Sequence, residues 1–211
     1  MNISIIGTGN IGAGLANLIA KHTSHSLTTG SRDSKPVPDL QGRATATTPA
    51  EAIRANEIVI LATPFPALSE VTASLGGAEA LAGKILVDVS NPLTPDMLGL
   101  TVSGQDSAGE TVARTFPGAR VVKAFNTVFA PVLAAHQPGR DAATAPTVFV
   151  AGDDADAKAK VVALAAELGF DALDAGPLTN SRYLEGTLEQ MIQLAKGQGL
   201  GMDIRLRVLR G

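Results

Sequence analysis

The sequence has no cysteine and no tryptophan, and aromatic residues make up only 3% of its 211 residues. Without cysteine, the chain cannot form disulfides, thiolate metal sites or a cysteine nucleophile. The few aromatic side chains also provide little surface on which nucleic-acid bases could stack. These absences exclude disulfide-stapled scaffolds and cysteine-dependent enzymes.

The sequence also lacks an excess of charge of one sign and any long apolar run. Its 17 Lys and Arg residues stand against 20 Asp and Glu residues, so no basic surface is indicated for a nucleic-acid backbone or an anionic membrane. No apolar run approaches the roughly 18 residues that span a bilayer, and no basic segment precedes Ile3 to indicate a signal peptide. We therefore expect a cytoplasmic protein without nucleic-acid or membrane partners.

Short apolar runs alternate with segments of helical periodicity, which is typical of parallel strands covered by helices on both faces. We predict an α/β fold of the Rossmann type, with a doubly wound, mostly parallel sheet of about eight strands. The expected strands are 2–6, 26–29, 43–46, 57–62, 84–89, 120–124, 147–151 and 170–174, and the expected helices are 10–21, 153–168 and 181–196. Residues 1–140 are expected to form the nucleotide-binding domain and 141–211 a smaller α/β part, either separate or continuous with it. A loop or lid is expected over 90–119 and a terminal edge strand over 204–209.

A glycine motif follows the first predicted strand and opens the first predicted helix. In this position GxGxxG predicts a turn that binds the diphosphate of a dinucleotide. The first glycine permits the tight turn, the second lets the backbone approach the diphosphate, and the third lets the helix close onto the strand. A glycine-rich turn without a ligand is the alternative. The candidate residues are Gly7, Thr8, Gly9, Asn10, Ile11 and Gly12.

The end of the second predicted strand indicates which dinucleotide would bind. An NAD site places a carboxylate at this strand tip to accept a hydrogen bond from the ribose 2′-hydroxyl. Here the strand runs into Ser31, Arg32 and Lys35, which can donate to a 2′-phosphate. We therefore predict NADP(H), although Asp33 lies nearby and a solvated basic loop is the alternative.

Three further loops follow predicted strands and should meet at the carboxyl edge of the sheet, where ligands bind in this fold. Their residues are small, apolar or amide-bearing, and ordinary X-Pro turns or helix caps would explain them as well. The candidate cofactor contacts here are Thr63, Pro64, Phe65, Asn91, Pro92 and Ala124, and the loop after Ala124 contains Asn126, Thr127 and Val128.

The titratable residues suggest no acid or base for catalysis. The three histidines, at positions 22, 25 and 136, are expected at the surface. Asp88 and Lys123 lie within predicted strands, where they are expected to pair with each other or with loop backbone in a structural role. No metal site and no serine-nucleophile turn are predicted.

The motifs together make the chain resemble the NADP oxidoreductases that depend on coenzyme F420, an 8-hydroxy-5-deazaflavin. This family also includes the reductase domain of membrane ferric reductases. The matching segments are 7–12 (GTGNIG), 30–32 (GSR), 121–127 (VVKAFNT) and 174–182 (DAGPLTNSR), so the likeness covers essentially the whole chain.

The resemblance implies NADPH on the glycine turn and a flat acceptor ring between the loops after 57–62 and 120–124. It implies that Thr8, Ser31, Arg32 and Lys35 serve the 2′-phosphate. It also implies that Asn126, Thr127 and Val128 border the deazaflavin, with the Leu206 region closing over it. Family members that reduce deazaflavins tend to have a histidine where this chain has Asn126, which leaves the acceptor open.

The function that we predict is hydride transfer between NADP(H) and a flat small-molecule acceptor, either coenzyme F420 or a flavin. Such a transfer needs no side-chain acid, because the protein mainly holds donor and acceptor carbons about 3–3.5 Å apart. Reduction of a small imine or hydroxyacid substrate and non-catalytic sensing of NADP(H) are the alternatives. A homodimer is also expected, and the small-substrate alternative would require the helix at 181–196 to pair between subunits.

Overall fold

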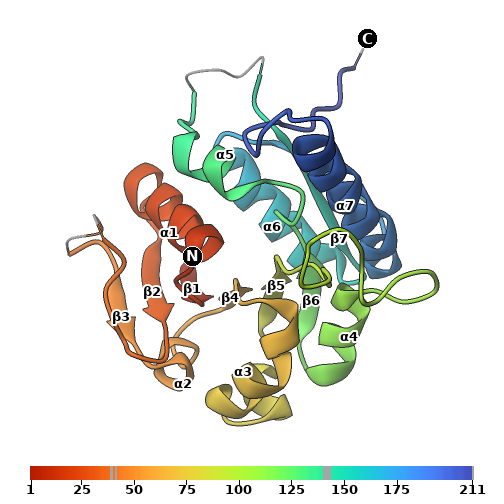
Figure 1. Cartoon of the computed structure of the whole chain (residues 1–211). Coiled ribbons are helices and arrows are strands. Elements are labelled where there is room, and N and C mark those ends of the chain that lie inside the picture. Colours follow the sequence, from red (N-terminus) through yellow and green to blue (C-terminus); the bar gives the residue numbers. More distant parts are fainter. Residues whose placement is uncertain (39, 41, 140–143, 211) are drawn as a thin grey trace.

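The chain forms an eight-stranded sheet with helices on both faces (Figure 1). A computed structural model describes residues 1–38, 40, 42–139 and 144–210. The strands are β1 (Asn2–Ile6), β2 (Ser26–Gly30), β3 (Thr45–Thr47), β4 (Ile58–Leu61), β5 (Ile85–Asp88), β6 (Arg120–Lys123), β7 (Thr147–Gly152) and β8 (Asp171–Asp174). The helices are α1 (Asn10–His22), α2 (Pro49–Ala52), α3 (Leu68–Leu75), α4 (Ala108–Thr115), α5 (Ala130–Ala135), α6 (Ala155–Glu167) and α7 (Ser181–Gly197). Short 3₁₀ turns lie at Phe65–Ala67, Ala78–Leu81 and Leu178–Asn180.

The strand order is β3-β2-β1-β4-β5-β6-β7-β8. The first six strands are parallel, β7 is antiparallel to β6, and β8 is parallel to β7. The order of the first six is that of the dinucleotide-binding fold, in which the chain reverses direction across the sheet between β1 and β4. The predicted α/β fold with a mostly parallel sheet is therefore confirmed.

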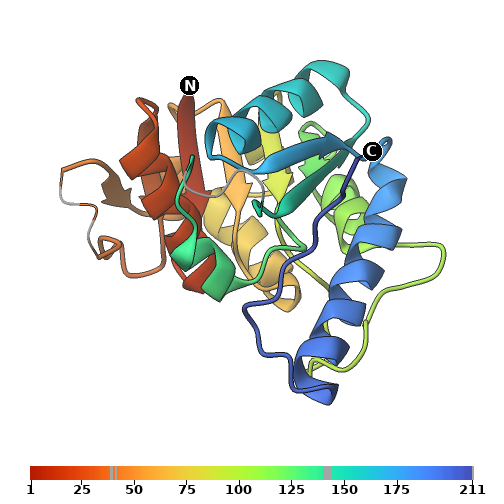
Figure 2. The same cartoon turned by 90° about the horizontal axis from the view of Figure 1, so that it is seen from above.

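Both faces of the sheet are buried, which explains why strand sequences such as IVIL in β4 are apolar throughout. Ile58 and Ile60 of β4 belong to one core with residues of α1, α5, α6 and α7, whereas Val59 and Leu61 belong to a second core with α2, α3 and α4. Figure 2 shows the sheet between these helices, with α7 running along one side of the molecule.

All eight strands and three helices predicted from the sequence are present, but four helices were not predicted. Three of these, α2, α3 and α5, have only four to eight residues, too few for a clear helical period. The fourth, α4, lies in the segment 90–119 that was predicted as a loop. Its signal is local, because the hydroxyl of Ser107 accepts a hydrogen bond from the backbone N–H of Glu110 and so caps the helix.

The terminal edge strand predicted over 204–209 is wrong. This segment is irregular, and it contacts the sheet through a hydrogen bond from the Thr147 N–H to the Leu206 carbonyl, 2.9 Å. The reason is that β7 already has β6 and β8 as neighbours. Thr147, the first residue of β7, lies beyond the end of the β6 ladder, whose last pair is Lys123 with Ala151, so only that end of β7 is open to another segment.

The sheet continues across the two expected domains, because β7 of the second part pairs with β6 of the first. The expected boundary at residue 140 lies outside the described residues. In the part of the chain that is described, no helix has the length and hydrophobicity needed to cross a bilayer.

Two glycine substitutions are predicted to change stability in opposite directions, because Gly30 of β2 is closely packed and Gly186 of α7 is not. A Cβ added at Gly30 would lie 2.9 Å from Ile6 Cδ1 and 3.0 Å from Ala52 Cβ, whereas one added at Gly186 of α7 would meet nothing within 4 Å. We expect Gly30→Ala to lower the free energy of unfolding by about 1–3 kcal/mol through overpacking. Gly186→Ala should raise it by about 0.5–1 kcal/mol, since alanine favours a helix interior. Urea denaturation measures both, and a stabilised Gly30→Ala variant would contradict the packing.

Candidate functional site

The glycine turn between β1 and α1 has the geometry that the motif predicts. Gly7 has φ +98°, and a Cβ there would lie 2.6 Å from the carbonyl oxygen of Ala62. A Cβ on Gly12 would lie 1.9 Å from the carbonyl oxygen of Gly7, so α1 closes directly onto the turn. By contrast, a Cβ on Gly9 would meet nothing within 4 Å, which leaves open space above the start of the helix.

The N-terminus of α1 is suited to bind an anion. Its N-cap is Gly9, which supplies no side-chain cap, and the first turn contains no acidic residue. The first N–H groups of a helix have no partner within the helix, and the helix dipole adds partial positive charge there. Because Gly9 leaves the space above them open, these N–H groups are accessible to a diphosphate.

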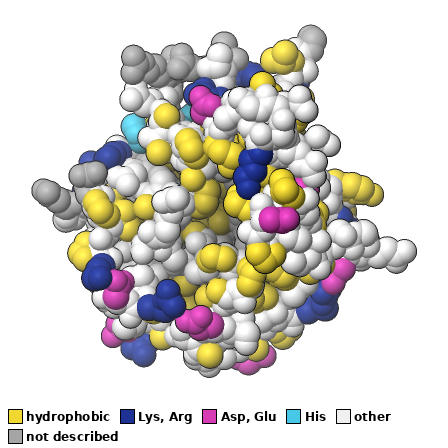
Figure 3. Space-filling model, viewed as in Figure 1, with side chains coloured by type: hydrophobic (Ala, Val, Ile, Leu, Met, Phe, Trp, Pro, Cys, Tyr) yellow, Lys and Arg dark blue, Asp and Glu magenta, His cyan; other side chains and the backbone are white. Residues whose placement is uncertain are grey.

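A cleft of about 650 Å³ extends from this turn across the ends of β1, β2 and β4 to α3. Figure 3 shows this side of the molecule, with a hollow near the centre of the view and hydrophobic side chains around it. The cleft is lined by seven of the predicted cofactor residues, namely Gly7, Thr8, Gly9, Ser31, Arg32, Thr63 and Pro64. The other eight predicted cofactor residues do not line it, namely Asn10, Ile11, Gly12, Lys35, Phe65, Asn91, Pro92 and Ala124.

The basic side chains at the end of β2 are paired with carboxylates in this structure. Lys35 Nζ lies 2.9 Å from Asp33 Oδ2, and the Ser31 hydroxyl donates to Asp33 Oδ1 at 3.0 Å. These two contacts, that of Lys35 first, lower the pKa of Asp33 to about 2. Arg32 Nη1 lies 3.4 Å from Glu70 Oε1, and the Arg32 side chain is 86% exposed. An incoming phosphate would therefore have to replace two carboxylates as the acceptor.

Two asparagines connect the loops that follow β5 and β6. Asn91 Nδ2 donates to the backbone carbonyl of Asn126 at 3.1 Å, and Asn126 Nδ2 donates to Asn91 Oδ1 at 3.0 Å. Neither residue caps a helix, since Ser107 caps α4 and Phe129 precedes α5. Asn126 Oδ1 is buried and has no hydrogen-bond partner among the described residues. The pair thus joins the two loops and leaves one acceptor free.

The other residues predicted around the acceptor are mostly buried. Thr127 and Val128 are each less than 5% exposed, and Ala124 is fully buried. Leu206 is half-buried against the core, with its carbonyl bound to Thr147. Their contact with a bound ring stays a prediction.

A buried ion network lies directly beneath these loops. Lys123, the last residue of β6, places Nζ 2.8 Å from Asp88 Oδ2, 2.8 Å from Glu185 Oε1 and 2.5 Å from the Ser90 carbonyl. The side chains of Lys123 and Asp88 are fully buried and that of Glu185 is 1% exposed. The structure confirms that Asp88 and Lys123 pair with each other and that the pair contacts loop backbone.

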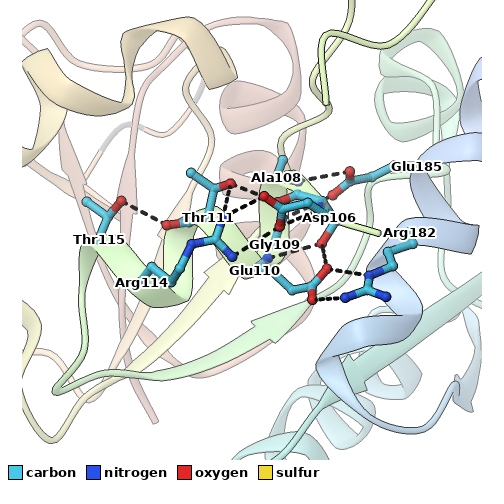
Figure 4. A network of polar contacts seen from close by, with 10 residues as sticks. Asp106, Ala108, Gly109, Glu110, Thr111, Arg114, Thr115, Arg182 and Glu185 are labelled. Carbon is cyan, nitrogen blue, oxygen red and sulfur yellow. Dashed lines mark hydrogen bonds and ion pairs between the residues drawn. The ribbon is translucent and has the colours of Figure 1, made fainter. Parts of the chain in front are cut away.

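Glu185 was not predicted, although it is the member that brings α7 into the network. Its carboxylate accepts hydrogen bonds from the N–H groups of Ala108 and Gly109 at the start of α4, at 3.0 and 3.1 Å (Figure 4). A signal for it was present: Glu185 falls on the buried stripe of α7, between Leu184 and Leu188. A charged residue at a stripe position indicates a buried partner.

The charges in the network shift one another's pKa. Burial raises the pKa of Glu185, and the neighbouring Lys123 opposes this shift without cancelling it. Burial lowers the pKa of Lys123, but the carboxylates of Asp88 and Glu185 outweigh burial and raise it overall. Lys123 is therefore charged at neutral pH.

A second contact between α4 and α7 is nearer the surface. Arg182 Nε donates to Glu110 Oε2 at 2.8 Å, and Arg182 Nη2 donates to Glu110 Oε1 at 2.5 Å (Figure 4). The Arg182 side chain is 31% exposed. The two helices are thus joined twice, once by this pair and once through the buried Glu185.

Comparison with known proteins finds a matching family model and similar solved structures. Residues 2–92 match the model of the family described as coenzyme F420-dependent NADP oxidoreductases. The crystal structure of a candidate F420-dependent NADP reductase from Arthrobacter sp. FB24 is 34% identical, with a TM-score of 0.85 and full coverage of both chains. A hypothetical protein from Sinorhizobium meliloti is 30% identical, with a TM-score of 0.74, and the match covers 86% of this chain and 87% of the other.

A longer relative matches over much of this chain. The metalloreductase STEAP3 of Rattus norvegicus is 35% identical over 184 residues, which are 87% of this chain and 35% of the metalloreductase. The chain therefore spans about a third of the length of that relative.

The ion network predicts a large effect for loss of its only cation among the described residues. Lys123→Met leaves the buried carboxylates of Asp88 and Glu185 without a counter-ion, so we expect the free energy of unfolding to fall by about 3–5 kcal/mol at pH 7. As a control, Lys84→Met removes an ammonium that donates to the Asn56 carbonyl, and it should cost no more than about 1.5 kcal/mol. Urea denaturation measures both.

The pH dependence of the Lys123→Met variant has a definite sign. Burial already raises the Glu185 pKa above 4.5, and without Lys123 the hydrogen bond from the Ala108 N–H is the main contact left to oppose it. A raised pKa in the folded state gives stability that is present below the ordinary pKa and lost as pH rises through the folded-state value. The deficit of the variant should therefore shrink as pH is lowered from 7 toward 4.5. A deficit that grows over this range would contradict the prediction.

Proposed function

Because this chain belongs to the family of coenzyme F420-dependent NADP oxidoreductases, we propose that it transfers hydride between NADP(H) and a flat acceptor of the deazaflavin or flavin type. The observation that carries the proposal is that two sets of features lie at the same carboxyl edge of the sheet. The open glycine turn and the cleft with Ser31 and Arg32 come first, and the Asn91–Asn126 pair follows at the ends of β5 and β6.

The residues present fit NADP(H). The free space above Gly9 leaves room for a diphosphate beside the first N–H groups of α1. Ser31 and Arg32 line the same cleft and already bind carboxylates, Asp33 and Glu70, so their donors are arranged for an anion. The cofactor supplies the hydride chemistry when bound. The protein supplies the binding site and holds the reacting rings in a fixed orientation.

The free acceptor on Asn126 supports a ring that carries an N–H group. A buried polar atom without a partner is unfavourable, so Asn126 Oδ1 gains stability when a bound molecule donates to it. Deazaflavin and flavin rings have such an N–H on their pyrimidine part, and a nicotinamide has one on its carboxamide. We propose that the side chains covering Asn126 Oδ1 move aside when a ring binds, so that this atom accepts from one of these groups.

Neutral side chains at the two loops favour transfer between rings over reduction of a carbonyl or imine. Asn91, Asn126 and Thr127 do not ionise, and the nearby Asp88 and Lys123 are fully buried and paired. Hydride transfer between flat rings proceeds without a positioned side-chain acid, whereas reduction of a carbonyl or imine gains from a proton donor within hydrogen-bond reach.

The choice of NADP(H) is tested by removing the guanidinium at the end of β2. Arg32→Ala should weaken NADPH binding about 10- to 100-fold, as expected for loss of a hydrogen bond to a charged group. NADH binding should change little, because NADH lacks the 2′-phosphate. Arg54→Ala removes an exposed arginine that does not line the cleft and serves as the control. Titration calorimetry measures these affinities, and equal losses for NADPH and NADH would overturn the role of Arg32.

The acceptor is tested by turnover. We expect the purified protein to oxidise NADPH when oxidised coenzyme F420 or a free flavin is present, as followed by the absorbance of both partners. Gly12→Ala should abolish turnover, since its Cβ would lie 1.9 Å from the Gly7 carbonyl oxygen. Binding of NADPH without consumption by any ring acceptor would instead indicate a sensing module, and turnover with imines alone would indicate a small-substrate reductase.

A further inference from the structure

The buried ion network is more elaborate than the packing of the sheet requires. Each N–H of the Lys123 ammonium has an acceptor within hydrogen-bond distance, on Asp88, Glu185 and Ser90. Buried ion pairs stabilise a fold no better than well-packed apolar side chains of the same size. The network therefore calls for a reason other than stability.

The network fixes the backbone at Ser90, directly before Asn91, and involves Lys123, which leads into the loop of Asn126. Ser90 is held at both ends, because its N–H donates to Asp88 Oδ1 at 2.9 Å and its carbonyl accepts from Lys123 Nζ at 2.5 Å. The next residue is Asn91, which pairs with Asn126. Lys123 itself ends β6, three residues before Asn126. Both loops thus start at the same buried ammonium.

We propose that Lys123, held in place by Glu185 of α7, is a positioning residue for the crevice. Through Ser90 it sets the Asn91–Asn126 pair, and this pair orients the nicotinamide and the acceptor ring. The part of the proposal that concerns the rings rests on the proposed function. The part that concerns the asparagine pair does not.

The surface pair Glu110–Arg182 provides a matched comparison. It joins the same two helices, α4 and α7, as Glu185 does (Figure 4). It does not extend to β5, β6 or Ser90, because its hydrogen bonds are to each other and to the cap residue Ser107. If Glu185 served only to dock α7 on α4, removal of either interaction would have the same kind of effect.

The experiment compares two double variants that each remove one charge of each sign. Lys123→Met with Glu185→Gln removes the ammonium and keeps Asp88, which still accepts from the Ser90 N–H. Glu110→Gln with Arg182→Met removes the surface pair. For each variant, the affinity for NADPH, the fluorescence anisotropy of the bound nicotinamide and the single-turnover rate of NADPH oxidation are measured well below the melting temperature.

We expect the buried double variant to bind NADPH within about 3-fold of the wild type, because the phosphates dominate affinity. Its nicotinamide anisotropy should fall, and its single-turnover rate should decrease about 10-fold or more, as a misplacement of about 1 Å can cause. The surface double variant should match the wild type in all three. Unchanged anisotropy and rate in the buried variant, with only a lower melting temperature, would overturn the proposal.

A measurement without ligand separates this proposal from the proposed function. The side-chain amide NMR signals of Asn91 and Asn126 should shift and exchange faster with solvent in the buried double variant, but not in the surface variant. If the wild type fails to bind NADPH, the proposed function fails. The NMR test still shows whether the network positions the asparagine pair. Should the double variant not fold, Glu185→Gln alone is read in the same way. Unshifted signals in a folded variant would overturn the positioning role.

Discussion

The interaction on which the arrangement of the loops at the carboxyl edge depends is the buried ammonium of Lys123. It joins three parts of the chain that are distant in sequence: the end of β5, the end of β6 and the helix α7. Through Glu185 the same ammonium is linked to the start of α4, whose N–H groups donate to that carboxylate. A sheet held only by apolar packing would tolerate small shifts of its loops. A charge surrounded by acceptors in a dry interior does not, because breaking any of its hydrogen bonds leaves a buried polar group unsatisfied.

The strand order separates two kinds of feature along the carboxyl edge of the sheet. The reversal of the chain between β1 and β4 separates the turns after these strands and opens the cleft there. On one side of this point, glycines bring backbone close to an anion. On the other, at β5 and β6, a hydrogen-bonded pair of amides joins two loops. One end thus presents backbone N–H groups and basic side chains, and the other presents a pair of neutral amides.

The sequence was sufficient to predict most of the sheet and the glycine turn, because both depend on local patterns. Buried parallel strands such as Ile85–Asp88 are short apolar runs, and the turn requires glycine at fixed offsets. Glu185 could not be placed in the same way, since its partners are 62 to 77 positions away and only the tertiary fold brings them together. The segment 204–209 was predicted as a strand because its pattern alternates, but it is irregular. It lies beside β7, which already pairs with β6 and β8. Local patterns say nothing of which edges remain free.

The paired side chains at the end of β2 have a consequence for the binding and release of a nucleotide. Because Ser31 and Lys35 contact Asp33, and Arg32 contacts Glu70, the two basic side chains at this strand end are matched by two carboxylates. Entry of a phosphate is then an exchange of one anion for another, and weak anions or neutral hydroxyls gain little from it. If a nucleotide phosphate binds here as proposed, its departure returns the donors to Asp33 and Glu70, so no unpaired cluster of positive charge is left. Under the proposed function, Asp33 and Glu70 compete with the phosphate for the same donors, and this competition favours its release.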